Sequence, residues 1–70
     1  MPELTNREQQ VFNLLLEGVQ TADIAEKLSI TKNTVKYFTK RIYKKLGVYS
    51  KPELIIRYRN EFFIEKRIIT

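Results

Sequence analysis

Lysine and arginine residues cluster in one stretch of this chain. Eight of them lie between Lys27 and Pro52, where no aspartate or glutamate occurs, although the net charge of the whole chain is only +5. Five of the eight acidic residues lie within the first 26 positions, so charge is unevenly distributed along the sequence. A basic surface without acids attracts a polyanion, and nucleic acid is the leading candidate.

The residues that usually carry catalysis are missing. The sequence contains no histidine and no cysteine, which removes the usual general base, the thiolate nucleophile and common metal ligands. No convergent carboxylates are available to activate the tyrosine and threonine hydroxyls. We therefore expect no enzyme, no cofactor, no metal site and no small-molecule substrate.

Length and composition indicate one globular domain. The chain has 70 residues, of which 43% are apolar and 30% are charged, and its longest apolar runs are three residues. Such runs are far too short to span a bilayer, and the N-terminus lacks the apolar segment of a signal peptide. We expect a single cytoplasmic domain over residues 1–70, in which residues 60–70 form an apolar C-terminal extension.

Capping signals divide the chain into four expected helices. Thr5 and Glu8 form a capping box, and Gly18 suits the left-handed position after a helix, so the first helix should run from about 6 to 17. The others are expected at about 22–28 with Thr21 as cap, at about 32–46 between Thr31 and Gly47, and after a second capping box of Ser50 and Glu53. No strand pattern is sustained, so the expected fold class is all-α.

The third expected helix has two contrasting faces. At 100° per residue, one stripe contains Val35, Phe38, Ile42 and Leu46, and the opposite side contains Asn33, Lys36, Tyr37, Lys40 and Lys44. A short helix, a tight turn and a longer helix with a basic outer face make a helix-turn-helix arrangement. The third helix would then be the recognition helix.

Several separate sequence blocks agree in order and spacing with a known family. They are Leu4-Thr5, Arg7-Glu8, Val11, Gly18, Ile24-Ala25, Leu28, Thr34-Val35-Lys36, Ile42, Lys45-Leu46-Gly47-Val48 and Ser50-Lys51. Over about residues 4 to 59, the chain resembles the DNA-binding domain of the LuxR/GerE family of bacterial transcription regulators. The resemblance implies a four-helix domain that places its third helix in the major groove of double-stranded DNA and dimerises through its fourth.

The resemblance also implies which residues contact DNA. Base-edge contacts are implied for Lys36, Tyr37 and Lys40, and phosphate contacts for Thr21, Thr31, Thr34 and Lys45. The residues themselves add Asn33 as a candidate base contact and Lys32 and Lys44 as candidate phosphate contacts. The alternative for the lysines is an ordinary solvated helix face, and the alternative for the two threonines Thr21 and Thr31 is a purely structural role as helix caps.

Three positions on the third helix depart from the family pattern. Phe38 stands where the family commonly has histidine, and Thr39 where it has an aliphatic residue, so the packing beneath the helix is expected to differ. Tyr37 is large for a position that approaches a base edge. Its side chain could contact a thymine methyl group or reach a phosphate with its hydroxyl.

The fourth expected helix is apolar around more of its circumference than a one-sided surface helix requires. Leu54, Ile55 and Tyr58 are the candidate dimerisation residues, and we expect a homodimer with a twofold interface there. The tail beyond Asn60 adds further apolar residues, among them Phe62, Phe63 and Ile64.

Two other interpretations remain open at the level of sequence. A sigma-factor-like promoter-binding domain shares the Leu-Thr-x-Arg-Glu opening and the four-helix layout, although the segment from Lys45 to Val48 followed by Ser50-Lys51 favours LuxR/GerE. A protein-interaction module could use the same fold to bind another regulator through the apolar tail. RNA polymerase is a further candidate partner in any of the DNA-binding interpretations.

Overall fold

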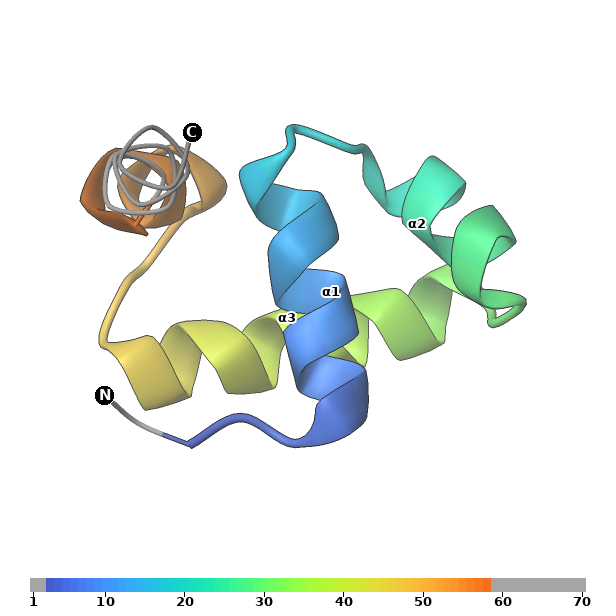
Figure 1. Cartoon of the computed structure of the whole chain (residues 1–70), viewed down its shortest axis with the longest axis horizontal. Helices are drawn as coiled ribbons and strands as arrows, with labels where there is room; N and C mark the ends of the chain where they lie inside the picture. The colour runs from blue at the N-terminus through green and yellow to red at the C-terminus, as the bar shows by residue number, and fades with distance from the viewer. Residues whose placement is uncertain (1–2, 59–70) are drawn as a thin grey trace, which may run out of the picture.

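The computed structural model describes residues 3–58, which form helices joined by short loops (Figure 1). Helix α1 spans Asn6–Leu16, α2 spans Thr21–Leu28 and α3 spans Lys32–Leu46. Residues 51–58 are also helical and are called the fourth helical segment below. No strand occurs among the described residues, so the predictions of an all-α fold and of four helices are confirmed. The predicted extension at 60–70 lies outside the described residues.

The N-terminal cap of α1 is the predicted capping box. The backbone N–H of Glu8 donates to Thr5 Oγ1 at 3.2 Å, and the backbone N–H of Thr5 donates to Glu8 Oε1 at 2.9 Å. Two amide groups that a helix start would leave without partners are satisfied in this way. Gly18 follows the helix with φ of +81°, as predicted from its freedom to adopt a left-handed conformation.

The start of α2 differs from the prediction. Thr21 is the first helical residue and not the cap, because Gln20 takes the extended N-cap conformation and no side chain caps the helix. Ser29 ends α2 with φ of +56°, the left-handed role that glycine fills elsewhere in this chain. The turn to α3 therefore begins at Ser29, where the sequence predicted the break.

The bounds predicted for α3 are confirmed. Thr31 Oγ1 accepts from the Thr34 backbone N–H at 3.1 Å, and Gly47 ends the helix with φ of +69°. The capping box predicted for the fourth helical segment is half correct. The Glu53 backbone N–H donates to Ser50 Oγ at 3.3 Å, but the Glu53 carboxylate accepts from the amide of Tyr49, at 2.7 Å, instead of that of Ser50.

A single apolar core lies where the helices cross. Its buried members are Val11, Phe12, Leu15, Leu16, Ile24, Ala25, Val35, Ile42, Leu46, Val48 and Leu54. Leu28 and Phe38 are partly buried and pack against it. Every helix contributes, so the orientation of α3 is fixed by residues from the whole domain.

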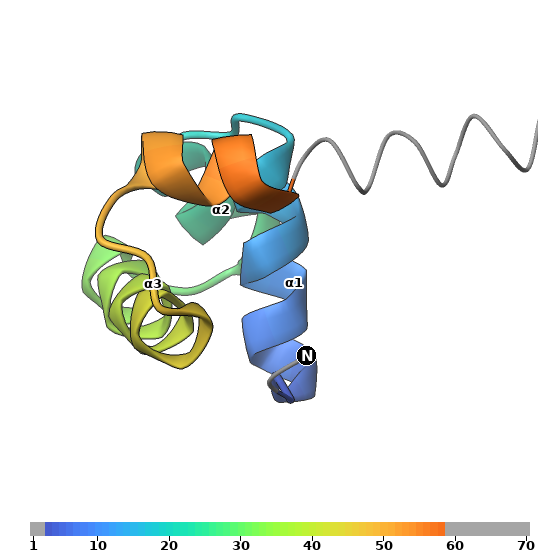
Figure 2. The ribbon, with the colours of Figure 1, turned by 90° about the vertical axis from the view of Figure 1, so that its left-hand side faces the viewer.

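The fourth helical segment packs across α1 (Figure 2). The rings of Phe12 and Tyr58 meet edge to face, with their centroids 5.9 Å apart. Lys51 Nζ also donates to the Val19 carbonyl at 3.1 Å, and Arg57 Nη1 donates to the Gly47 carbonyl at 3.3 Å. These contacts tie the segment to the loops at the ends of α1 and α3. Within residues 3–58, no helix has the length and apolar composition that crossing a membrane requires.

Candidate nucleic-acid interface

The outer face of α3 carries the polar side chains that the sequence placed there. Its members Asn33, Lys36, Tyr37, Lys40 and Lys44 are all exposed, while Val35, Ile42 and Leu46 on the inner face are buried. The helix is thus divided into a core side and a solvent side, as its 3.6-residue periodicity predicted. We call the five exposed residues the outer face of α3.

The lysines of the outer face of α3 form no ion pair with any acid among residues 3–58. Within residues 3–58, the only two ion pairs both involve Glu8, and neither includes a residue of this face. Lys36, Lys40 and Lys44 therefore have no carboxylate partner in the described part of the chain. Three exposed ammonium groups on one helix face make a positive surface that attracts anions.

Glu8 joins α1 to α3 through a buried carboxylate. Only 1% of the Glu8 side chain is exposed. Lys45 Nζ donates to its Oε1 at 2.6 Å and Arg41 Nε donates to its Oε2 at 3.0 Å. Hydrogen bonds from Lys45 and from the backbone of Thr5 lower the pKa of Glu8 from 4.5 to about 2, against the opposing effect of desolvation.

The Glu8 ion pairs were missed at the level of sequence. Glu8 was assigned a capping role, which is correct but incomplete. The position of Glu8 is the signal that could have predicted these ion pairs. Glu8 precedes Val11 and Leu15 by three and seven residues and therefore lies on the inward stripe of α1. A carboxylate on an inward stripe needs a cation from a neighbouring helix.

Lys44 and Lys45 differ in their surroundings, although both were candidate phosphate contacts. Lys44 is exposed. The ammonium of Lys45 is held by Glu8, and 29% of the Lys45 side chain is exposed. Lys44 is therefore the freer of the two charges.

Tyr37 is fixed in place by its neighbours on α3. Arg41 Nη1 donates to the Tyr37 hydroxyl oxygen at 3.4 Å, and the ring of Phe38 meets the Tyr37 ring edge to face at 5.5 Å. Thr39, the other unusual residue of this helix, donates its hydroxyl to the Val35 carbonyl at 2.8 Å. The hydroxyl that Thr39 introduces beneath the helix therefore has a hydrogen-bond partner within α3.

The first turn of α3 exposes polar groups beside the outer face. The hydroxyls of Thr31 and Thr34 lie 2.9 Å apart, and Lys32 and Asn33 are exposed next to them. A helix N-terminus favours anions, which fits the predicted phosphate contacts. Thr21, the remaining candidate, is half-buried in the first turn of α2.

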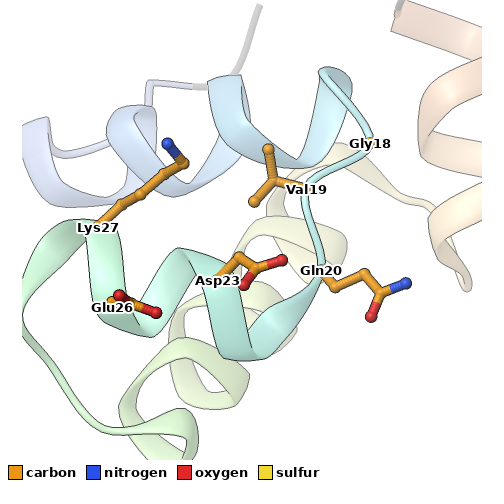
Figure 3. Close-up of a pocket in the computed structure, with 6 residues that line it drawn as sticks. All are labelled: Gly18, Val19, Gln20, Asp23, Glu26 and Lys27. Atoms are coloured by element: carbon orange, nitrogen blue, oxygen red, sulfur yellow. The ribbon is translucent and has the colours of Figure 1, made fainter.

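An open groove lies between α2 and the loop that precedes it (Figure 3). It is lined by Gly18, Val19, Gln20, Asp23, Glu26 and Lys27. None of these residues belongs to the outer face of α3, and the lining combines two acids with one lysine. The groove is therefore distinct from the candidate nucleic-acid interface.

One of the three candidate dimerisation residues is placed differently from the expectation. Leu54 is fully buried and belongs to the core, so it lies on the inward side of the fourth helical segment. Ile55 and Tyr58 are half-buried. Two large apolar side chains are exposed in this region: Ile56 on the segment, with 72% of its surface exposed, and Tyr49 in the loop before it, with 92%.

The helices and the basic outer face of α3 define a helix-turn-helix domain of the kind that bacterial transcription regulators use. Residues 2–58 match the model of the GerE family, described as bacterial regulatory proteins of the luxR family. The chain belongs to this family, which confirms the resemblance inferred from its sequence blocks.

Three curated relatives of the chain are named as regulatory proteins. An HTH-type transcriptional regulator of Aeromonas salmonicida is 46% identical over 57 residues, which is 81% of this chain. The transcriptional regulatory protein DesR of Bacillus subtilis is 38% identical over 83% of the chain, and the oxygen regulatory protein NreC of Staphylococcus aureus is 35% identical over 94%. The matched regions are 29%, 29% and 28% of these three proteins, so the chain spans less than a third of their length. No solved structure matches the chain significantly.

Proposed function

We propose that this chain binds double-stranded DNA in a sequence-specific manner and thereby regulates transcription, with α3 as the recognition helix. The observation that carries the proposal is the outer face of α3, where three exposed lysines and Tyr37 have no acidic partner within residues 3–58. The major groove of B-DNA admits an α-helix, and lysine donates to O6 and N7 of guanine. Such a regulator acts on the chromosome, and we place it in the bacterial cytoplasm.

The contacts divide into two classes. Base-edge contacts come from Asn33, Lys36, Tyr37 and Lys40, which share the exposed side of α3. Phosphate contacts come from the helix starts and the end of α3, namely from Thr21, Thr31, Lys32, Thr34, Lys44 and Lys45. Base contacts give specificity, while phosphate contacts fix the register and give salt-dependent affinity.

The proposal includes a homodimer formed through the fourth helical segment. Ile56 exposes 72% of its surface there, and the candidate residues Ile55 and Tyr58 on the same segment are half-buried. Two copies related by a twofold axis would cover this apolar surface and would present two α3 helices to a symmetric DNA site.

A selection from a random-duplex library with the full chain, at moderate salt, tests the proposal. Enrichment of a motif with twofold symmetry is the expected result. Retention of DNA without a motif would contradict sequence specificity, and no retention even at low salt would contradict DNA binding and favour a protein-interaction module.

Substitutions on α3 test its role on the selected duplex. The double variant Lys36→Ala with Lys40→Ala should lose at least about tenfold in affinity, since each base contact of this kind contributes about 1–3 kcal/mol. Lys27→Ala is the charge-matched control for Lys36→Ala and for Lys40→Ala made singly, because this exposed lysine lines the groove beside α2 and not the outer face of α3 (Figure 3). If neither single variant weakened binding more than Lys27→Ala, α3 would be excluded as the recognition helix.

A further inference from the structure

Tyr37 is an aromatic side chain on the outer face of α3, and two neighbours hold it. The guanidinium carbon of Arg41 lies 5.6 Å from the centroid of the Tyr37 ring, and Arg41 Nη1 donates to the Tyr37 hydroxyl oxygen at 3.4 Å. On another side, the Phe38 ring meets it at an interplanar angle of 67°. Tyr37 still exposes 56% of its surface. Its position is therefore fixed by contacts along the helix and not by burial.

Arg41 is itself anchored to another helix. Its Nε donates to Glu8 Oε2 at 3.0 Å, and the Glu8 carboxylate is fixed in turn by Lys45 and by the amide of Thr5. The guanidinium group is planar and rigid, so a bond through Nε limits the directions in which Nη1 can point. Arg41 therefore links the position of Tyr37 to α1.

The hydrogen bond between Arg41 and Tyr37 determines what the phenol can offer to a ligand. Arginine can only donate, so the Tyr37 oxygen is the acceptor and its own O–H proton is directed away from Arg41. Tyr37 is thus a hydrogen-bond donor toward the solvent side of α3. In the major groove, the matching acceptors are phosphate oxygens and the N7, O6 and O4 atoms of the bases.

Building on the proposed function, we infer that Arg41 is a positioning residue that holds the Tyr37 hydroxyl as a donor to an acceptor on the DNA. In this arrangement the guanidinium acts through Tyr37: its Nε is bound to Glu8 and its Nη1 to the Tyr37 hydroxyl oxygen. The hydroxyl of Tyr37, and not contact between its ring and a thymine methyl group, carries the interaction.

The test compares variants of the full chain for binding to the selected duplex and to a scrambled duplex. Tyr37→Phe keeps the ring and removes the hydroxyl, and we expect three- to tenfold weaker binding to the selected duplex, the usual effect of one hydrogen bond. Arg41→Lys keeps the positive charge but lacks the planar fork, and we expect a similar loss. The double variant should lose little more than either single variant, because both changes remove the same interaction.

The two kinds of acceptor give different patterns. A loss confined to the selected duplex assigns the Tyr37 hydroxyl to a base edge, whereas an equal loss on both duplexes assigns it to a phosphate oxygen. Either pattern supports the inference. Wild-type affinity of Tyr37→Phe would overturn it, as would additive losses in the double variant.

A direct phosphate contact by Arg41 is the competing explanation. It predicts that Arg41→Lys binds as the wild type does, while Arg41→Ala reduces the slope of affinity against salt by about one. That result would overturn the positioning role.

Two further outcomes separate the inference from the proposed function. If the wild type binds no duplex, the proposed function fails and the inference fails with it. If the wild type binds and Tyr37→Phe has the same affinity, only the inference fails. Thermal unfolding shows whether each variant is folded. If the Arg41 variants are not folded, the affinity of Tyr37→Phe, a change at an exposed position, decides whether the Tyr37 hydroxyl donates to the DNA.

Discussion

The Glu8 carboxylate in the first turn of α1 lies 2.6 Å from the Lys45 ammonium in the last turn of α3. The same carboxylate completes the capping box of α1 and accepts from Arg41. One buried acid thereby sets both where α1 begins and how α3 is held against it. The orientation of the candidate recognition helix depends on a residue that lies outside that helix.

The first prediction concerns stability at low pH. The pKa of Glu8 is lowered to about 2 in the folded chain, against 4.5 as its ordinary value. The unfolded chain therefore takes up a proton at Glu8 first as the pH falls, and the contribution of this carboxylate to stability is lost between about pH 4.5 and pH 2. Urea unfolding at pH steps across this window should show the free energy of unfolding decreasing.

Glu8→Gln is the control for the pH prediction. The amide oxygen of glutamine can still accept from the Thr5 amide, but the charge that faces Lys45 and Arg41 is gone. We expect the melting temperature at pH 7 to fall by about 5 °C. The decrease in stability between pH 4.5 and pH 2 should be smaller than in the wild type. An unchanged pH profile would show that other carboxylates account for it.

The second prediction concerns the helix caps. Thr31→Ala should destabilise the chain by about 1 kcal/mol, because Thr31 Oγ1 accepts from the Thr34 amide at the start of α3. Thr21→Ala is the matched control, since Thr21 is the first residue of α2 and makes no side-chain cap. Denaturant unfolding of the two variants should therefore give clearly different losses. Equal losses would contradict the assignment of Gln20 as the cap of α2.

The third prediction concerns Ser29, which adopts a left-handed conformation with φ of +56°. This conformation costs a non-glycine residue roughly 1 kcal/mol, so Ser29→Gly should leave the melting temperature unchanged or raise it by a few degrees. Gly47→Ala is the opposite change, at a position with φ of +69°. It should lower the melting temperature, and a rise on calorimetry would argue against the left-handed end of α3.

Features that depend on residues close together in the sequence could be predicted from the sequence alone. The cap at Thr31, the end at Gly47 and the division of α3 into two faces each follow from residue types a few positions apart, where local geometry decides the outcome. The order and spacing of the sequence blocks were sufficient to identify the family. Most of the architecture and the candidate face of α3 could therefore be predicted.

The features that the sequence did not predict depend on residues far apart in the chain. Glu8 and Lys45 are 37 positions apart, and no local rule pairs them. Leu54 was expected on a dimer surface because the helix that contains it is apolar on several sides, and only packing against the other helices decides which side is buried. The anchoring of Arg41 on Glu8 was missed for the same reason.

The fourth prediction tests the burial of Leu54. Leu54→Ala should destabilise the chain by about 2–5 kcal/mol, the usual cost of emptying a fully buried leucine site. Ile56→Ala, two residues later, should change stability by less than about 0.5 kcal/mol, because 72% of Ile56 is exposed. Similar losses in denaturant unfolding would mean that the fourth helical segment does not pack as described.

The last prediction concerns the proposed homodimer. Ile56→Glu places a charge on the exposed apolar side of the fourth helical segment, and burying that charge between two copies is unfavourable. Sedimentation over a concentration series, with and without the selected duplex, should show self-association of the wild type and at least about tenfold weaker association of the variant. The melting temperature of the variant at low concentration should stay close to that of the wild type, since the core is untouched. A wild type that remains monomeric under all these conditions would exclude the dimer, and unchanged association of Ile56→Glu would move the interface to another surface.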